Sequence, residues 1–102
     1  MLDRITVLKE FLKEEPDDAF TLYALALEYI KIDDLAAADR LFSHLMEMHA
    51  DYLPAYYHAG KLKEALGKNE EARLLYRKGV KLAESKKDLH TLNELKTALD
   101  EE

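Results

Sequence analysis

Histidine is the residue type in this sequence best suited to acid–base or metal chemistry, and four are present: His44, His49, His58 and His90. His44 and His49 are five residues apart, a spacing that does not place two metal ligands on one face of a helix. His58 lies near Tyr57 and Glu64 and could act as a general base. No nucleophile, pair of oxyanion donors or phosphate-binding loop accompanies it. The sequence therefore predicts no catalytic residue, no metal site, no cofactor and no enzymatic activity.

Cysteine and clustered basic residues offer little further chemistry. The chain has no cysteine, which excludes a disulfide scaffold and a thiolate nucleophile. One basic run could bind phosphate or RNA: Arg73, Arg77, Lys78 and Lys81. Glu70 and Glu71 are at pairing distance in the same stretch, which is typical of a solvated helix face. The net charge is −6, and residues 1–50 carry all of it, with five basic and eleven acidic residues. Because this field repels phosphate backbones, we expect no nucleic-acid partner and favour a partner with a basic segment.

The elements that position these side chains are predicted to be helices. Only three Gly and two Pro occur in 102 residues, and the abundant Ala, Leu, Glu and Lys favour helix. Apolar spacing and breakers such as Pro16 indicate helices over residues 2–14, 18–31, 34–49, 52–66, 70–85 and 89–100. We expect most of them to begin at polar residues able to cap a helix, these being Asp17 or Asp18, the pair Asp33 and Asp34, Asp51, Asn69 and Asp88.

Two stretches of the chain repeat each other at a spacing of 34 residues. The matched pairs are Leu22 and Tyr56, Ala26 and Gly60, Ala38 and Ala72, Phe42 and Tyr76, and Met48 and Leu82. Such a fixed period indicates stacked repeats of two helices each. Small residues would let paired helices approach closely, and we expect Gly60 to face Ala72 in this way.

The residue types at these repeated positions resemble those of the tetratricopeptide repeat (TPR), a helix–turn–helix unit of this length. Lys63 departs from the pattern, since it occupies a slot where tyrosine is usual. The resemblance implies an all-α, right-handed superhelical solenoid of about six antiparallel helices, or three helical hairpins. It also implies a single TPR-like domain, made of a half-repeat helix at 1–16, repeats at 19–52 and 53–86, and a C-terminal capping helix at 87–102.

In this family the first helices of successive repeats line a concave groove that binds partners. By position, the first repeat would contribute an apolar stripe to the groove, made of Phe20, Tyr23, Leu27 and Ile30. The second would contribute a mixed polar strip of Tyr57, His58, Lys61 and Glu64. Alternatively, the first helix covers Phe20 and Tyr23, which would then belong to the core. The Lys and Asn clamp that some TPR proteins use for the acidic tails of heat-shock chaperones is absent, so we expect no binding of those tails.

The function that the resemblance implies is a non-catalytic scaffold or adaptor. It would bind an unknown peptide or partner protein in the partly apolar groove. The alternative is a self-associating structural module that homodimerises through the incomplete N-terminal repeat. Charges interrupt every apolar run near the N-terminus, so we expect no signal peptide, no membrane contact and a cytoplasmic location.

Overall fold

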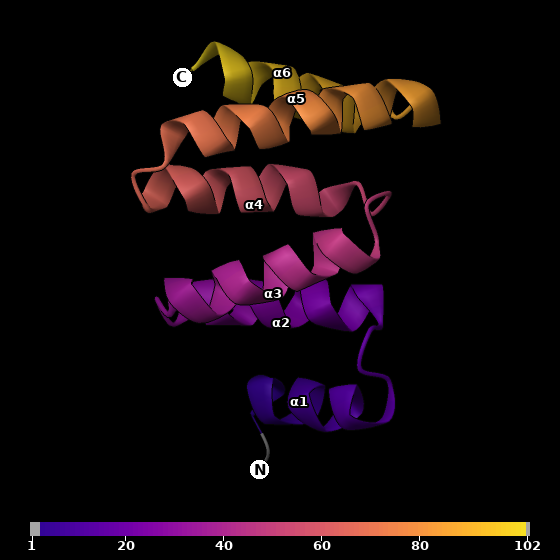
Figure 1. Cartoon of the computed structure of the whole chain (residues 1–102), viewed down its shortest axis with the longest axis vertical. Helices are drawn as coiled ribbons and strands as arrows, with labels where there is room; N and C mark the ends of the chain where they lie inside the picture. Colours follow the sequence, from indigo (N-terminus) through magenta and orange to yellow (C-terminus); the bar gives the residue numbers. More distant parts are fainter. Residues whose placement is uncertain (1–2, 102) are drawn as a thin grey trace. The chain divides into compact units, whose positions relative to one another are not determined.

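Six α-helices are present in residues 3–101, the part of the chain that the computed structural model describes (Figure 1). They are α1 (Arg4–Glu14), α2 (Ala19–Lys31), α3 (Leu35–Met48), α4 (Pro54–Ala65), α5 (Asn69–Lys86) and α6 (Leu89–Asp100). Each bound lies within two residues of the predicted one. Leu2, the predicted start of the first helix, lies outside the described residues.

Aspartate carboxylates begin several of these helices. Asp18 accepts a hydrogen bond from the backbone N–H of Thr21 at 3.0 Å, and Asp88 accepts one from Thr91 at 3.1 Å. Asp3 and Asp34 cap α1 and α3 in the same way. Each carboxylate satisfies an amide that has no partner inside its helix.

Two of the predicted caps are wrong. The N-cap of α4 is Leu53 rather than Asp51, and it makes no side-chain hydrogen bond, because Pro54 at the first turn already lacks an N–H. Asn69 lies inside α5, whose N-cap is Lys68, again without a side-chain hydrogen bond. Glu70 and Glu71 in the first turn of α5 complement the helix dipole instead.

The turns that follow α2 and α4 have the same backbone geometry. Asp33 (φ 63°) and Gly67 (φ 77°) occupy the left-handed region and lie 34 residues apart. In each turn the next residue donates its N–H to a carbonyl five residues back, Asp34 to Tyr29 at 2.9 Å and Lys68 to Lys63 at 2.8 Å. Both are Schellman-type helix ends. The 34-residue period is therefore present in the backbone as well as in the residue types.

The first compact unit, Met1–Ala50, contains α1, α2 and α3. Helix α2 packs against both α1 and α3. Its buried residues include Leu22, Leu25 and Ala26, and those of α3 include Ala38 and Phe42. Helix α1 has no fully buried residue, so it is the most weakly packed helix of this unit.

The second compact unit, Asp51–Glu102, contains α4, α5 and α6. Helix α5 packs against both α4 and α6. One cluster of buried side chains in this unit joins the N-cap of α4 to residues of α5 and α6: Leu53, Ala72, Tyr76, Ala83, Leu95 and Ala98. The Tyr76 ring is fully buried, and its hydroxyl donates a hydrogen bond to a carboxylate oxygen of Glu64. The polar end of this aromatic is thereby satisfied within an apolar cluster.

Glycines allow close packing on both sides of α5, though the partner of one differs from the prediction. A Cβ atom at Gly60 would lie 2.2 Å from Cε1 of Tyr76, so the nearest neighbour of Gly60 is the Tyr76 ring rather than Ala72. A Cβ atom at Gly79 would lie 2.9 Å from Cδ1 of Leu95 and 2.9 Å from Cβ of Tyr56. Because neither site has room for a methyl group, glycine is needed at both.

Candidate functional site

An apolar hollow lies on α2 in the first unit. Phe20, Tyr23 and Leu27, three residues of the predicted stripe, line a cavity of about 280 Å³. Phe20 is 61% exposed, and the other two are partly buried. The alternative that α1 covers Phe20 is therefore wrong. Ile30, the fourth residue of the stripe, is partly buried and does not line this cavity.

Ion pairs form the rim of this hollow. The Glu28 carboxylate lies 3.4 Å from Nε of Arg4 on α1 and 2.9 Å from Nζ of Lys31. All three residues line the same cavity. The hollow thus combines an apolar floor with a polar edge, the arrangement that binding sites for peptide side chains commonly have.

The predicted polar strip lies on α4 in the second unit. The rings of Tyr57 and His58 meet edge to face with centroids 5.3 Å apart, and Nζ of Lys61 lies 5.7 Å from the Tyr57 ring centroid. Lys61 also lies 3.9 Å from Glu101. Glu64 accepts the Tyr76 hydrogen bond, so it has a structural role in addition to any binding role.

Burial or hydrogen-bond contacts define the surroundings of His44, His49 and His58. Burial lowers the pKa of His58, which favours its neutral form. Nε2 of His44 lies 2.8 Å from the Asp17 carboxylate, and Nε2 of His49 lies 2.6 Å from the Asp17 carbonyl oxygen. These two side chains therefore attach α3 to the segment between α1 and α2. Within residues 3–101, no group of three His, Asp or Glu side chains is arranged to hold a metal ion.

One residue of the basic run on α5 is paired with a neighbouring acid. Arg73 pairs with Glu70 one turn earlier. Glu71 pairs with Lys63 of α4 at 3.3 Å. Lys63 occupies a position where the repeat pattern usually has tyrosine. Its side chain therefore contributes an ion pair between α4 and α5 in place of an aromatic ring.

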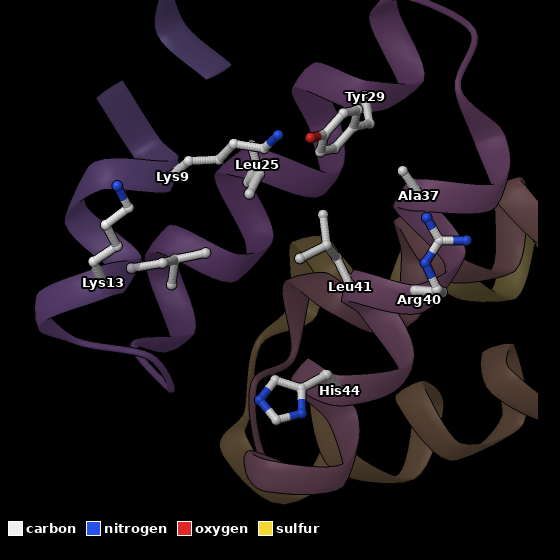
Figure 2. A pocket seen from close by; sticks show the side chains of 9 residues that line it. Lys9, Lys13, Leu25, Tyr29, Ala37, Arg40, Leu41 and His44 are labelled. Carbon is white, nitrogen blue, oxygen red and sulfur yellow. The ribbon is translucent and has the colours of Figure 1, made fainter. Parts of the chain in front are cut away.

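A larger cavity of about 460 Å³ lies in the first unit among α1, α2 and α3 (Figure 2). Its apolar lining comes from Leu12, Leu25, Ala37 and Leu41, and its basic lining from Lys9, Lys13 and Arg40. This site is not predictable from the sequence, because its lining depends on the relative placement of three helices. The signal available in the sequence was weak: apolar and basic residues alternate on one face of α1 and on one face of α3.

Helices paired through small residues, with matching turns 34 residues apart, define a helical repeat protein. A family model described as Tetratricopeptide repeat matches residues 53–86. A tetratricopeptide repeat domain protein from Salinibacter ruber has a crystal structure that is 39% identical, covering 82% of this chain and 93% of that one, with a TM-score of 0.79. This chain therefore belongs to the tetratricopeptide repeat family.

Two further solved structures support the fold. The solution structure of the tetratricopeptide repeat domain protein from Salinibacter ruber is 40% identical and covers 84% of this chain and 87% of that one, with a TM-score of 0.80. A protein from Bordetella parapertussis is 22% identical, covers 99% of this chain and 88% of that one, and has a TM-score of 0.84. At that identity it shows the fold alone. No match is found among curated proteins.

The prediction of an all-α TPR protein is thus confirmed, with helices packed in sequential hairpins. TPR domains generally act as protein-interaction modules, and the comparisons indicate no catalytic family. No helix within residues 3–101 is both long and apolar enough to cross a lipid bilayer.

Proposed function

We propose that this chain is a non-catalytic scaffold or adaptor that binds a peptide or partner protein in a partly apolar groove. The proposed binding residues are Phe20, Tyr23, Leu27 and Ile30 on α2 and, in the second unit, Tyr57, His58, Lys61 and Glu64 on α4. The observation that carries the proposal is the exposure of Phe20, at 61%, beside the hollow that Tyr23 and Leu27 line. A large aromatic exposed next to an apolar hollow is typical of a surface that a partner covers.

The chemistry of these residues favours a partner with an apolar anchor. An aliphatic or aromatic side chain would fill the hollow and cover Phe20, which removes apolar surface from water. The paired charges of Arg4, Glu28 and Lys31 would exchange hydrogen bonds with the partner backbone at the edge. Lys61 would offer a charge to an acidic group of the partner.

The test uses peptides selected from a random displayed library against the wild-type protein. We expect the double change Tyr23→Ala and Leu27→Ala to weaken their binding by roughly tenfold or more, because truncated anchors dominate interface energies. Leu74→Ala, which shortens a 52% exposed leucine on α5, is the matched control and should have no effect. Binding is measured by fluorescence anisotropy and folding by circular dichroism.

The double change tests the groove only if the protein stays folded. Should it lower the melting temperature strongly, the stripe on α2 belongs to the core rather than to a binding surface. Phe20→Ala then keeps the proposal testable, because this side chain is mostly exposed and its loss leaves the core intact. Unchanged peptide affinity in a folded Phe20→Ala variant would contradict the groove.

Self-association is the second candidate function, and α1 supplies the observation that favours it. Val7 and Phe11, one turn apart on α1, are 49% and 50% exposed. A second copy of the chain that covers this pair would bury it in an isologous dimer. Light scattering from micromolar to millimolar concentration should then show a dimer that Phe11→Glu dissociates. A strict monomer across that range would exclude this function.

A further inference from the structure

The largest cavity described above lies outside the proposed groove and shares no lining residue with the hollow on α2. All nine of its lining residues belong to the first unit, and they come from α1, α2 and α3. At about 460 Å³ it falls in the size range of small-ligand and side-chain pockets. Its ligand can therefore be inferred from this unit alone.

The floor of the cavity is apolar. Leu25 and Ala37 are buried beneath it, while Leu12 and Leu41 are partly buried at its walls. In Figure 2, Leu41 of α3 and Leu25 of α2 lie between the lysines of α1 and Arg40 of α3. Such a lining favours an apolar side chain over a hydrated ion, because covering the partly exposed Leu12 and Leu41 removes them from water.

The rim of the cavity is cationic. Lys9 and Lys13 come from α1 and Arg40 comes from α3, and none of the described residues that line the cavity is acidic. This is notable because residues 1–50 hold five basic and eleven acidic residues in all. Three of those five basic residues line this one cavity, so the basic residues of the first unit are concentrated at its rim.

The three cationic side chains differ in the ion pairs and hydrogen bonds that they already make with neighbouring groups. Lys13 pairs with Glu10 at 2.9 Å on an exposed face, so the pair is weak. Nζ of Lys9 lies 5.8 Å from the Tyr29 ring centroid, and a hydrogen bond with the Tyr29 side chain raises the pKa of Lys9. Arg40 makes no ion pair with any other residue from 3 to 101. The guanidinium of Arg40 is therefore the group most available to a carboxylate.

The walls are two helical faces, which fits a peptide better than a compact metabolite. On α3 the lining residues Ala37, Arg40, Leu41 and His44 follow the helical spacing of one face. They extend along roughly 10 Å of the helix axis, at about 1.5 Å per residue. That length matches about three residues of an extended strand.

We propose that this cavity binds an acidic peptide segment that carries a bulky aliphatic side chain. A leucine-type side chain would lie on the floor between Leu25 and Leu41, and flanking carboxylates would pair with Arg40 and the lysines of α1. A polyanion such as RNA fits less well, since it would place hydrated phosphates against leucine side chains. The proposal is independent of the groove on α2, because the two surfaces share no residue.

The test is an amide-resolved NMR titration with three synthetic peptides, each acetylated and amidated. One carries two leucines flanked by Asp and Glu, the second replaces the acids with Lys, and the third replaces the leucines with Ala. We expect only the first to give saturable shifts, confined to residues that line the cavity. Affinity should fall as salt concentration rises, because the contacts at the rim are electrostatic.

Reversing the charge of Arg40 tests the proposed contact between this side chain and the carboxylates of the peptide. Arg40→Glu should weaken the acidic peptide by roughly tenfold or more, since it places like charges together. The matched control is Arg77→Glu, an exposed arginine of α5 that does not line the cavity, and it should change the affinity less than about twofold. The groove variant Tyr23→Ala with Leu27→Ala should bind this peptide normally, which separates the present proposal from the proposed function.

Several results would overturn the proposal. They are the absence of saturable shifts at millimolar peptide, equal binding of the lysine peptide, and equal losses from Arg40→Glu and Arg77→Glu. A single-stranded RNA oligomer that displaces the peptide at equal concentration would identify a general polyanion surface instead. Equal binding of the alanine peptide would show that the leucine floor has no role.

Discussion

The ring of Tyr76 occupies the space that a side chain at position 60 would need. The Tyr76 side chain is fully buried, and its hydroxyl is held by Glu64 of α4. It can move neither outward into solvent nor sideways without losing that hydrogen bond. The helix pair α4 and α5 therefore depends on glycine at position 60.

We predict that Gly60→Ala lowers the free energy of unfolding by about 1–2 kcal/mol. The added Cβ would lie 2.2 Å from Cε1 of Tyr76. Overpacking of this kind costs about 1–3 kcal/mol, and the better helix propensity of alanine offsets up to about 1 kcal/mol of it. Urea unfolding followed by circular dichroism measures the change.

A double-mutant cycle supplies the control for this prediction. In a Tyr76→Leu background the same alanine meets a smaller side chain, so Gly60→Ala should cost less there than in the wild type. Equal costs in the two backgrounds would mean that the two residues do not interact. That result would remove the structural reason for glycine at this position.

At the residue scale, the sequence shows which positions are small but not which residue each one faces. The period of 34 correctly marked Gly60, Ala72 and Tyr76 as buried positions of the second repeat. It assigned Ala72 as the neighbour of Gly60, because close helix approach usually pairs two small residues. The observed neighbour is the ring four residues later on α5, since the register of the two helices is not encoded in either helix alone.

At the scale of single elements, capping decides where the helices begin, and α6 offers the clearest test. The Asp88 carboxylate accepts hydrogen bonds from the backbone N–H and the hydroxyl of Thr91. The backbone hydrogen bond from Thr91 is the main cause that lowers the pKa of Asp88 below 3.8, with the side-chain bond next. The charged form is therefore stabilised by folding.

We predict that Asp88→Asn flattens the acid dependence of stability. Because the folded-state pKa is lowered, the contribution of the carboxylate is fully present above a pH of about 4 and is lost as the pH falls through the folded-state value. Asparagine still accepts the Thr91 N–H bond but does not titrate in this range. Melting temperatures measured from neutral pH down to acid should fall less steeply in the variant.

Asp88→Ala is the matched comparison for this cap. It removes the acceptor as well as the charge, so it should lower the stability of α6 at neutral pH, where Asp88→Asn has little effect. Identical acid dependence in wild type and Asp88→Asn would show that the Asp88 carboxylate does not contribute to folding stability.

The caps also show where sequence reasoning fails at this scale. The observed caps Asp18, Asp34 and Asp88 lie among the predicted start residues, although the prediction left two candidates open at each of the first two. Each observed cap directly precedes an apolar helical pattern. The predictions for Asp51 and Asn69 were wrong, since Pro54 and the acidic first turn of α5 allow those helices to begin without a polar cap. Where several residues within three positions could each begin a helix, the sequence alone does not show which of them is the N-cap.

For the molecule as a whole, the sequence predicts surfaces on one helix better than surfaces shared by several. The stripe of Phe20, Tyr23 and Leu27 follows from the period of a single helix, and the three residues do line one hollow. The cavity around Arg40 and Leu41 needs three helices in register, which no periodicity encodes. The superhelical course and the division into one domain with two repeats stay predictions.

The two units also differ in charge and in core. Residues 1–50 carry the whole net charge of −6, whereas residues 51–102 hold ten basic and ten acidic residues. The second unit has its own cluster of buried side chains centred on Tyr76 and Leu95. In the first unit, by contrast, α1 has no fully buried residue. Repulsion among the excess acidic residues and the weak packing of α1 both indicate that the first unit is the less stable of the two.

We therefore predict that residues 51–102, produced alone, fold into a helical unit. Every member of its buried cluster lies inside this segment, and TPR-type units depend mainly on contacts between neighbouring helices. A chain of this length is only marginally stable, so the excised unit should unfold below the melting temperature of the full chain. Circular dichroism should show helix and a cooperative thermal transition. Tyr76→Ala should abolish the transition, because it removes the largest side chain of the cluster. A random-coil spectrum for residues 51–102 would show that the cluster cannot hold α4, α5 and α6 together without the first unit.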